Sequence, residues 1–224
     1  MSLIGSPGPR FECNAVVDGR LAQLSWEQLQ EGKWLVLVFY PLDFTFVCPT
    51  EIIAYSEAAD RFATLEARVA AISVDSVYTH LAWVNTTRNQ GGLGEIAIPL
   101  ISDLDRSIAR AYDVLLPEGI ALRALFLIDP KGRIRHATIN DLPVGRSVEE
   151  TIRVLEAFQF HEANGEVCPA NWRPGEGTIV ADPVGAQTYF ATAYAKNSGK
   201  RGTLKRIAIK NENPGVPVLA GTVK

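Results

Sequence analysis

The chain has 224 residues, of which 47% are hydrophobic, and a formal net charge of −3. This length can bury one large core with extensions, and the charge gives no reason to expect binding to nucleic acid or a membrane surface. No apolar run approaches the roughly 20 residues of a membrane span, and the N-terminus lacks a basic segment followed by an apolar one, so we expect a cytoplasmic protein. The three cysteines, at 13, 48 and 168, are too few for a disulfide framework and share no metal-ligand spacing with the three histidines, so we expect no metal site.

Residues 1–33 are rich in glycine, proline and polar residues, which predicts an extension packed on a core rather than a domain. Its candidates for regular structure are a strand over 12–17 and a helical turn over 25–29. After this extension, strands and helices are expected to alternate. They are a strand over 34–40, a helix over 49–65, a strand over 68–74, a helix over 77–90, a strand over 96–101 and a short helix over 106–112.

Two further apolar runs, 122–128 and 133–139, are joined by Asp-Pro-Lys-Gly, whose turn chemistry predicts a hairpin. A last helix over 147–160 begins with a capping box and repeats its apolar residues at helical spacing. Alternating strands and helices predict a parallel sheet, to which the hairpin adds an antiparallel edge. The order therefore favours an α/β, thioredoxin-like fold with a mixed central sheet over 34–165, although order alone leaves other α/β folds open.

Beyond residue 160 the chain changes character. Residues 161–178 hold few apolar positions and predict an exposed arm, and a C-terminal arm over 166–195 carries Cys168 and a short helix over 186–195. Residues 196–224 form a basic and apolar tail, with six basic residues and no acidic ones between 196 and 210. Such charge blocks are usually solvated, which is the interpretation we favour over contact with an acidic partner.

A lone cysteine follows the first long strand. Pro41 ends that strand, because proline cannot donate to the ladder. Pro49 suits the first position of a helix and pushes the preceding residue out of the helical region, so Cys48 is expected to be the N-cap. There the helix macrodipole and unpaired backbone N–H groups stabilise a thiolate. On this pattern alone, the alternative that Cys48 is a small buried hydrophobe stays open.

Five stretches between residues 4 and 190 stand out as motifs. They are Tyr40-Pro41-x-x-x-Thr45-x-x-Cys48-Pro49-Thr50-Glu51, Thr79-His80-Leu81-Ala82-Trp83, Gly91-Gly92-Leu93-Gly94, Gly119-Ile120-Ala121-Leu122-Arg123 and Val167-Cys168-Pro169. In this order they resemble the typical two-cysteine peroxiredoxins of the AhpC/TSA family. The resemblance implies a thioredoxin-like fold and an antioxidant thiol peroxidase that reduces hydrogen peroxide and small organic hydroperoxides. It implies no flavin, haem or metal cofactor, because sulfur carries the redox chemistry.

The resemblance also implies roles around Cys48, which would be the nucleophile that attacks the peroxide. Arg123 would hold the thiolate and the peroxide, and Thr45 would hydrogen-bond to the peroxide oxygens. Pro41 would shield the sulfur from bulk water. Supporting roles fall to Arg146 as a second cation, to Glu51, which would orient the arginines, and to Tyr40, which precedes the motif.

Several of these residues also have an ordinary structural interpretation. Thr45 fits a loop hydroxyl, Arg123 a strand residue whose charged end reaches solvent, and Glu51 an acid that favours the first turn of a helix. His80 is of a type suited to a general base, but a thiolate needs none, so we assign His80 to packing or an interface. Cys13 lies outside every matched stretch and is given no catalytic role.

Peroxide would leave Cys48 as a sulfenic acid, which condenses readily with another thiol. The resemblance implies that this thiol is Cys168 of the partner subunit in an antiparallel homodimer, joined by an intersubunit disulfide. Family dimers often assemble into decameric rings through the region of Thr79. Thioredoxin, or a similar dithiol such as glutaredoxin, tryparedoxin or a dedicated flavoprotein reductase, would reduce the disulfide.

Two matched elements bear on regulation. Gly91-Gly92-Leu93-Gly94 and Tyr189-Phe190 resemble segments that pack over the site in some family members and slow disulfide formation. The delay favours oxidation to sulfinic acid, which sulfiredoxin reverses in the family. This chain continues past Phe190. Its tail would hold the helix of Tyr189 and Phe190 in place, displace it or make no contact with it.

Three competing functions follow from the same features. A thiol-disulfide oxidoreductase is disfavoured because Cys48 has no C-x-x-C partner. A holdase chaperone, which some family members become after overoxidation, is compatible with peroxidase activity. A cysteine hydrolase needs a histidine positioned as a base, and the sequence positions none.

Overall fold

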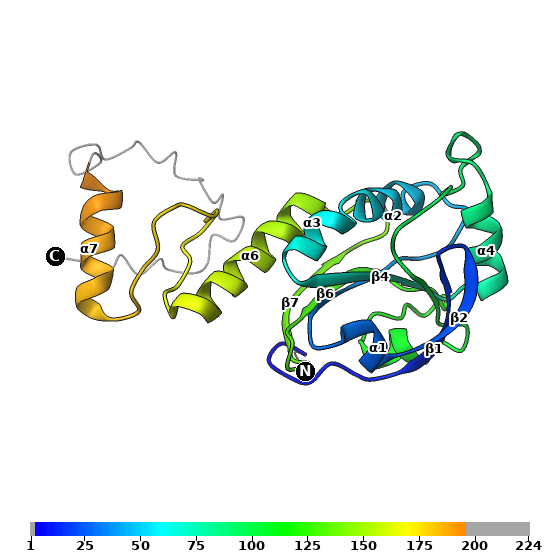
Figure 1. Ribbon diagram of the computed structural model, residues 1–224, viewed down its shortest axis with the longest axis horizontal. Coiled ribbons are helices and arrows are strands. Elements are labelled where there is room, and N and C mark those ends of the chain that lie inside the picture. The colour runs from blue at the N-terminus through cyan, green and yellow to red at the C-terminus, as the bar shows by residue number, and fades with distance from the viewer. Residues whose placement is uncertain (1–2, 196–224) are drawn as a thin grey trace, which may run out of the picture.

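The computed structural model describes residues 3–195, so the tail predicted for 196–224 lies outside the described residues. Its centre is a seven-stranded sheet in the order β2-β1-β5-β4-β3-β6-β7 (Figure 1). β3, β4 and β5 run parallel to one another. The other neighbouring pairs, β3–β6, β6–β7, β5–β1 and β1–β2, are antiparallel, which confirms the mixed α/β sheet. The strands are β1 Glu12–Val17, β2 Arg20–Ser25, β3 Trp34–Phe39, β4 Ala67–Ser73, β5 Leu100–Ser102, β6 Arg123–Ile128 and β7 Ile134–Asn140.

The sheet separates two hydrophobic cores, because successive side chains of a strand point to opposite faces. Val36 and Val38 of β3 join the core that contains Cys48, while Leu35 and Leu37 join the other. Helices α2, α3, α4 and α6 cover the first core, and α1 and α5 cover the second. The helices are α1 Trp26–Gln30, α2 Cys48–Glu57, α3 Ala59–Thr64, α4 Val77–Asn85, α5 Ser107–Ala111, α6 Val148–Asn164 and α7 Pro183–Ala193.

Two predicted helices are interrupted in the structure. The helix predicted over 49–65 consists of α2 and α3, which meet at Ala58 (φ −90°, ψ 3°), and nothing in the local sequence explains the break. The helix predicted over 77–90 ends before Thr86, a β-branched residue that takes extended dihedral angles. A separate 3₁₀ turn, Arg88–Gln90, follows it.

The sheet also differs from the prediction at its N-terminal edge. The strand expected over 96–101 is reduced to β5, because Pro99 has no N–H to donate to a ladder. The sequence analysis missed β2, which pairs with β1 through a turn at Asp18 and Gly19, both at positive φ (48° and 68°). An Asp-Gly pair is a strong hairpin signal. The N-terminal segment therefore supplies two strands of the sheet.

The C-terminal segment extends away from the sheet along α6 (Figure 1). α6 continues beyond the predicted residue 160 until Gly165 ends it in the left-handed conformation (φ 73°). Trp172 was expected on an exposed arm but is 2% exposed, with its ring 4.9 Å from that of Phe160. α7 begins at Pro183 after the N-cap Asp182, earlier than predicted.

Among the described residues, no helix is long and apolar enough to cross a membrane. Within the same range, no group of three or more His, Cys, Asp or Glu residues is arranged to hold a metal ion.

Candidate active site

Cys48 is the first residue of α2, not its N-cap as expected. The N-cap is Val47, which already has helical dihedral angles (φ −86°, ψ −34°). Its carbonyl accepts hydrogen bonds from the backbone N–H and the hydroxyl of Thr50, at 3.1 and 2.7 Å, so helical bonding starts one residue early. These bonds override the usual effect of Pro49 on the residue before it. The sulfur still lies in the first turn of α2, where Cys48 is 0% exposed.

A buried cluster of charged side chains surrounds the sulfur. Nη1 of Arg123, at the start of β6, lies 3.4 Å from Sγ of Cys48 and 2.8 Å from Oε2 of Glu51. Nε of Arg123 donates to the carbonyl of Leu142 at 2.6 Å, which fixes the plane of the guanidinium. Nε and Nη2 of Arg146 bind the two oxygens of Glu51 at 2.8 and 2.9 Å. The structure therefore brings together Cys48, Glu51, Arg123 and Arg146.

This cluster has a net positive charge, because two guanidinium groups share one carboxylate. Burial acts to raise the pKa of Glu51, but the hydrogen bonds and charges of Arg146 and Arg123 outweigh it and hold this pKa below its ordinary value. Glu51 is therefore ionised near neutral pH and neutralises one of the two cations. The remaining positive charge lies beside Sγ of Cys48.

The loop between β3 and α2 lies against a second buried network. The hydroxyl of Tyr40 donates to Oδ1 of Asp43 at 2.7 Å, and Nδ1 of His80 lies 2.7 Å from Oδ2. Burial raises the pKa of Asp43, and the hydrogen bond and charge of His80 act against that rise. Pro41 is buried, and the hydroxyl of Thr45 donates to the carbonyl of Leu42 at 2.8 Å. Asp43 was missed by the sequence analysis, although it lies inside the motif that identified Cys48.

The Gly91–Gly94 segment forms a tight loop after α4. Gly91 and Gly94 have positive φ values (80° and 62°), and a Cβ on Gly92 would lie 2.0 Å from the carbonyl oxygen of Thr86. Leu93 is fully buried in the core that contains Cys48, and Nε1 of Trp83 donates to the carbonyl of Gly91 at 2.9 Å. Backbone conformation therefore favours glycine at positions 91 and 94, and close packing requires it at position 92.

Cys168 and the Tyr-Phe pair lie away from Cys48 in the single chain. Sγ of Cys168 lies 3.5 Å from the carbonyl of Ala157 on α6, and all three cysteines are free. Tyr189 and Phe190 are on α7, which buries none of its residues and stands at the opposite end of the molecule from α4 (Figure 1). Within one chain, the structure does not bring either element onto the Cys48 site.

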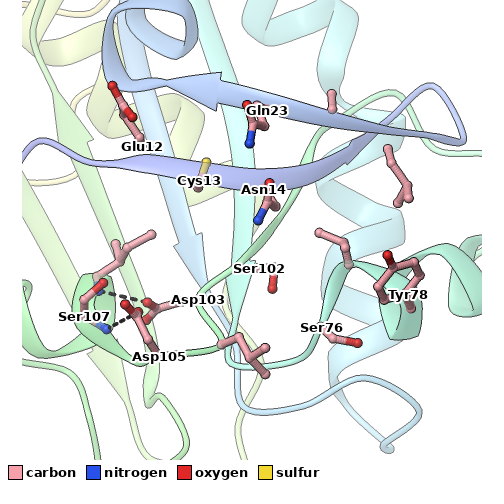
Figure 2. A pocket seen from close by; sticks show the side chains of 15 residues that line it. Glu12, Cys13, Asn14, Gln23, Ser76, Tyr78, Ser102, Asp103, Asp105 and Ser107 are labelled. Atoms are coloured by element: carbon pink, nitrogen blue, oxygen red, sulfur yellow. Dashed lines mark hydrogen bonds between the residues drawn. The ribbon is translucent and has the colours of Figure 1, made fainter.

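Cys13 borders a groove of about 710 Å³ between the β1–β2 hairpin and the segments that begin α4 and α5 (Figure 2). Cys48 does not line this groove. Burial raises the pKa of Cys13 to about 11, so it stays a thiol near neutral pH. Its surroundings provide none of the charge stabilisation found at Cys48.

A thioredoxin-like sheet with a buried thiol at a helix start, in contact with a guanidinium, defines a thiol-based redox enzyme. Residues 4–137 match the AhpC/TSA family, and residues 157–192 match the C-terminal domain of 1-Cys peroxiredoxin. The chain therefore belongs to the AhpC/TSA family and is a peroxiredoxin, a thiol peroxidase.

Individual relatives agree with this assignment. Peroxiredoxin TSA1-B of Candida albicans is 55% identical over 189 residues, covering 84% of this chain and 96% of the relative. The mitochondrial thioredoxin-dependent peroxide reductase of Mus musculus is 56% identical, covering 83% of this chain and 72% of the relative. The reduced 2-Cys peroxiredoxin structure of Plasmodium vivax has a TM-score of 0.83 at 41% identity, covering 85% of this chain and all of that one. These matches confirm the resemblance to two-cysteine peroxiredoxins.

Proposed function

We propose that the protein reduces hydrogen peroxide and small organic hydroperoxides through Cys48, with Cys168 of a second subunit as the resolving thiol. The observation that carries this proposal is the 3.4 Å contact between Nη1 of Arg123 and Sγ of Cys48 within a buried cluster of net positive charge. Such a cluster favours the thiolate and places donors where negative charge develops.

The first step transfers an oxygen atom from peroxide to sulfur. The Cys48 thiolate attacks one peroxide oxygen, the O–O bond breaks, and the other oxygen leaves with the bonding electron pair and takes up a proton. Arg123 stabilises the developing charge, Thr45 hydrogen-bonds to the peroxide, and Pro41 excludes water. Arg146 and Glu51 hold Arg123 in place, and Tyr40 supports the loop through Asp43. The products are Cys48 sulfenic acid and water or an alcohol.

The second step requires the first turn of α2 to open, because Cys48 is fully buried. The Cys168 thiol of the partner then displaces water from the sulfenic acid and forms a disulfide. An antiparallel homodimer fits the fold, because β7 is an edge strand with unpaired backbone groups and the arm leaves from α6 beyond it. Dimers would assemble into decameric rings through the region of Thr79.

An external dithiol returns the disulfide to two thiols. The relatives named thioredoxin-dependent peroxide reductase support thioredoxin as this reductant. We propose a cytoplasmic location, which differs from the mitochondrial one in the names of those relatives. Packing of Tyr189-Phe190 over Gly91–Gly94 of a partner would slow the disulfide step. Overoxidation, sulfiredoxin repair and a secondary holdase role belong to the same proposal.

The test combines rapid mixing with cysteine variants. On mixing with hydrogen peroxide, we expect Cys48 to oxidise far faster than a free cysteine, and Cys48→Ser to abolish turnover with thioredoxin while Cys13→Ser leaves it unchanged. Non-reducing electrophoresis after one equivalent of peroxide should show a dimer that Cys168→Ser removes. Co-expressed Cys48→Ser and Cys168→Ser subunits should regain a disulfide dimer, because pairing crosses subunits. Ordinary thiol reactivity at Cys48 contradicts the proposal, and a dimer that persists in Cys168→Ser contradicts the resolving pair.

A further inference from the structure

The turn that leads into Cys48 contains a strained residue. Phe44 has φ 52°, in the left-handed region that bulky side chains rarely adopt. Such a conformation persists only where the surrounding structure enforces it. The ring of Phe44 is half exposed and lies 6.0 Å from that of Trp83 on α4, so the ring alone anchors the turn weakly.

Asp43, the residue before Phe44, is anchored at three points. Its two carboxylate oxygens are bound by Tyr40 and by Nδ1 of His80, at 2.7 Å each. Its backbone N–H donates to Oδ2 of Asp75 at 2.9 Å. The side chains of Asp43 and His80 are 1% and 0% exposed, so water does not compete for these bonds.

Both ring nitrogens of His80 face oxygen atoms. Nε2 lies 3.2 Å from the carbonyl oxygen of Ile101, which can only accept, so Nε2 carries a proton. A second proton lies between Nδ1 and the carboxylate of Asp43. The titratable groups that face this pair are Tyr40 and Asp75. With both nitrogens engaged, His80 has no free lone pair with which to act as a base.

We propose that His80 is a positioning residue for the peroxidase reaction: it holds the Asp43 carboxylate and thereby fixes the Pro41–Thr45 turn around the Cys48 thiol. The inference rests on the proposed function of Cys48. His80 lies on α4, and the turn that its partner Asp43 belongs to leads directly into α2, which begins at Cys48. Without the bond to Asp43, the strained turn relaxes and the side chains around the sulfur move.

Three substitutions separate the two bonds of His80. The amide nitrogen of asparagine stands close to the position of Nδ1, and that of glutamine close to Nε2. His80→Asn therefore keeps a donor to Asp43, His80→Gln keeps only the donor to Ile101, and His80→Leu keeps neither. Each variant is made in a chain that also carries Cys13→Ser and Cys168→Ser, so that peroxide oxidises Cys48 alone. His161→Asn, which alters a half-buried histidine on α6, is the matched control.

The rate constant of Cys48 with hydrogen peroxide is the main readout. We expect His80→Asn and His161→Asn to stay within about threefold of the parent, and His80→Gln and His80→Leu to fall roughly ten- to a hundredfold, as misplaced site groups do. Near-ultraviolet circular dichroism verifies that each variant is folded. A folded His80→Gln protein with the parent rate overturns the inference, as does an equal loss in His80→Asn and His80→Gln. A slow parent protein instead contradicts the proposed function of Cys48.

Nuclear magnetic resonance tests the hydrogen bonds without relying on activity. In protein labelled with ¹⁵N-histidine, we expect a proton coupled to each ring nitrogen of His80, as its two hydrogen bonds require. His136 and His161 serve as internal references. Loss of the Nε2 proton, or an Nδ1 signal that Asp43→Asn leaves unchanged, contradicts the bonding on which the inference depends.

Discussion

Glu51 binds both guanidinium groups beside Cys48, and its side chain is only 2% exposed. Removing one partner of a buried ion pair leaves an uncompensated charge, which costs more than the net contribution of the intact pair. The arginines need this carboxylate to stay buried, while the sulfur needs their excess positive charge. One residue thus connects the stability of the site with its reactivity.

Substituting Glu51→Gln should therefore lower the free energy of unfolding by about 3 to 5 kcal/mol at neutral pH. Because the pKa of Glu51 is lowered in the folded state, its contribution is present above the ordinary value of 4.5 and is lost as the pH falls through the folded pKa. Urea unfolding of the parent and of Glu51→Gln at decreasing pH should show that the difference between their free energies of unfolding becomes smaller. Glu149→Gln, which removes an exposed ion pair with Arg61, is the control, and a pH-independent difference contradicts this account.

The Gly91–Gly94 loop shares a hydrophobic core with α2, and in the proposed mechanism the two separate before the disulfide forms. Arg88 links them: its Nε donates to the carbonyl of Leu93 at 3.0 Å, and its Nη1 binds Glu57, the last residue of α2, at 2.7 Å. Both side chains are largely exposed, so the ion pair contributes at most about 1 kcal/mol. In the proposed mechanism, this link opposes the separation of the Gly91–Gly94 loop from α2, although it holds the end of α2 away from Cys48.

We expect Arg88→Ala to speed disulfide formation about fivefold, since loss of roughly 1 kcal/mol from the closed state has that effect on the opening equilibrium. Less sulfinic acid should then accumulate at high peroxide, as mass spectrometry of Cys48 would show. Arg61→Ala removes a similarly exposed ion pair elsewhere and should change neither quantity. Equal behaviour of the two variants would show that Arg88 does not restrain α2.

At the scale of the whole molecule, the sheet has two edge strands, β2 and β7. Each has one exposed aliphatic side chain of similar accessibility, Leu21 at 47% and Ile139 at 50%. Edge strands are templates for pairing with another chain. We favour β7 as the dimer edge because α6 and the arm with Cys168 extend past that side (Figure 1).

Ile139→Glu should convert the dimer to a monomer, because two like charges would be buried where the edges meet. Sedimentation would measure the change, and the Cys48–Cys168 disulfide should be lost while peroxide still oxidises Cys48. Leu21→Glu, on the opposite edge, should leave the dimer intact. A dimer in Ile139→Glu and a monomer in Leu21→Glu would place the interface at β2.

The sequence alone determined the family and the α/β alternation, because the motif around Cys48 and the apolar periodicity are local. It also placed β3, the β6–β7 hairpin and the start of α6 close to their observed bounds. It missed β2 although Asp18 and Gly19 carry a local hairpin signal. It also placed the N-cap of the helix at Cys48, whereas the N-cap is Val47 and Cys48 is the first helical residue.

Only the tertiary structure decided which side chains meet. Arg123 lies 75 residues from Cys48 and 72 from Glu51, and their contacts exist because β6 pairs with β3 beside the start of α2. His80 lies 37 residues from Asp43, and its burial between that carboxylate and β5 follows from the packing of α4 on the sheet. Hydrogen-bond partners at such separations depend on strand order, which has no local signature in the sequence.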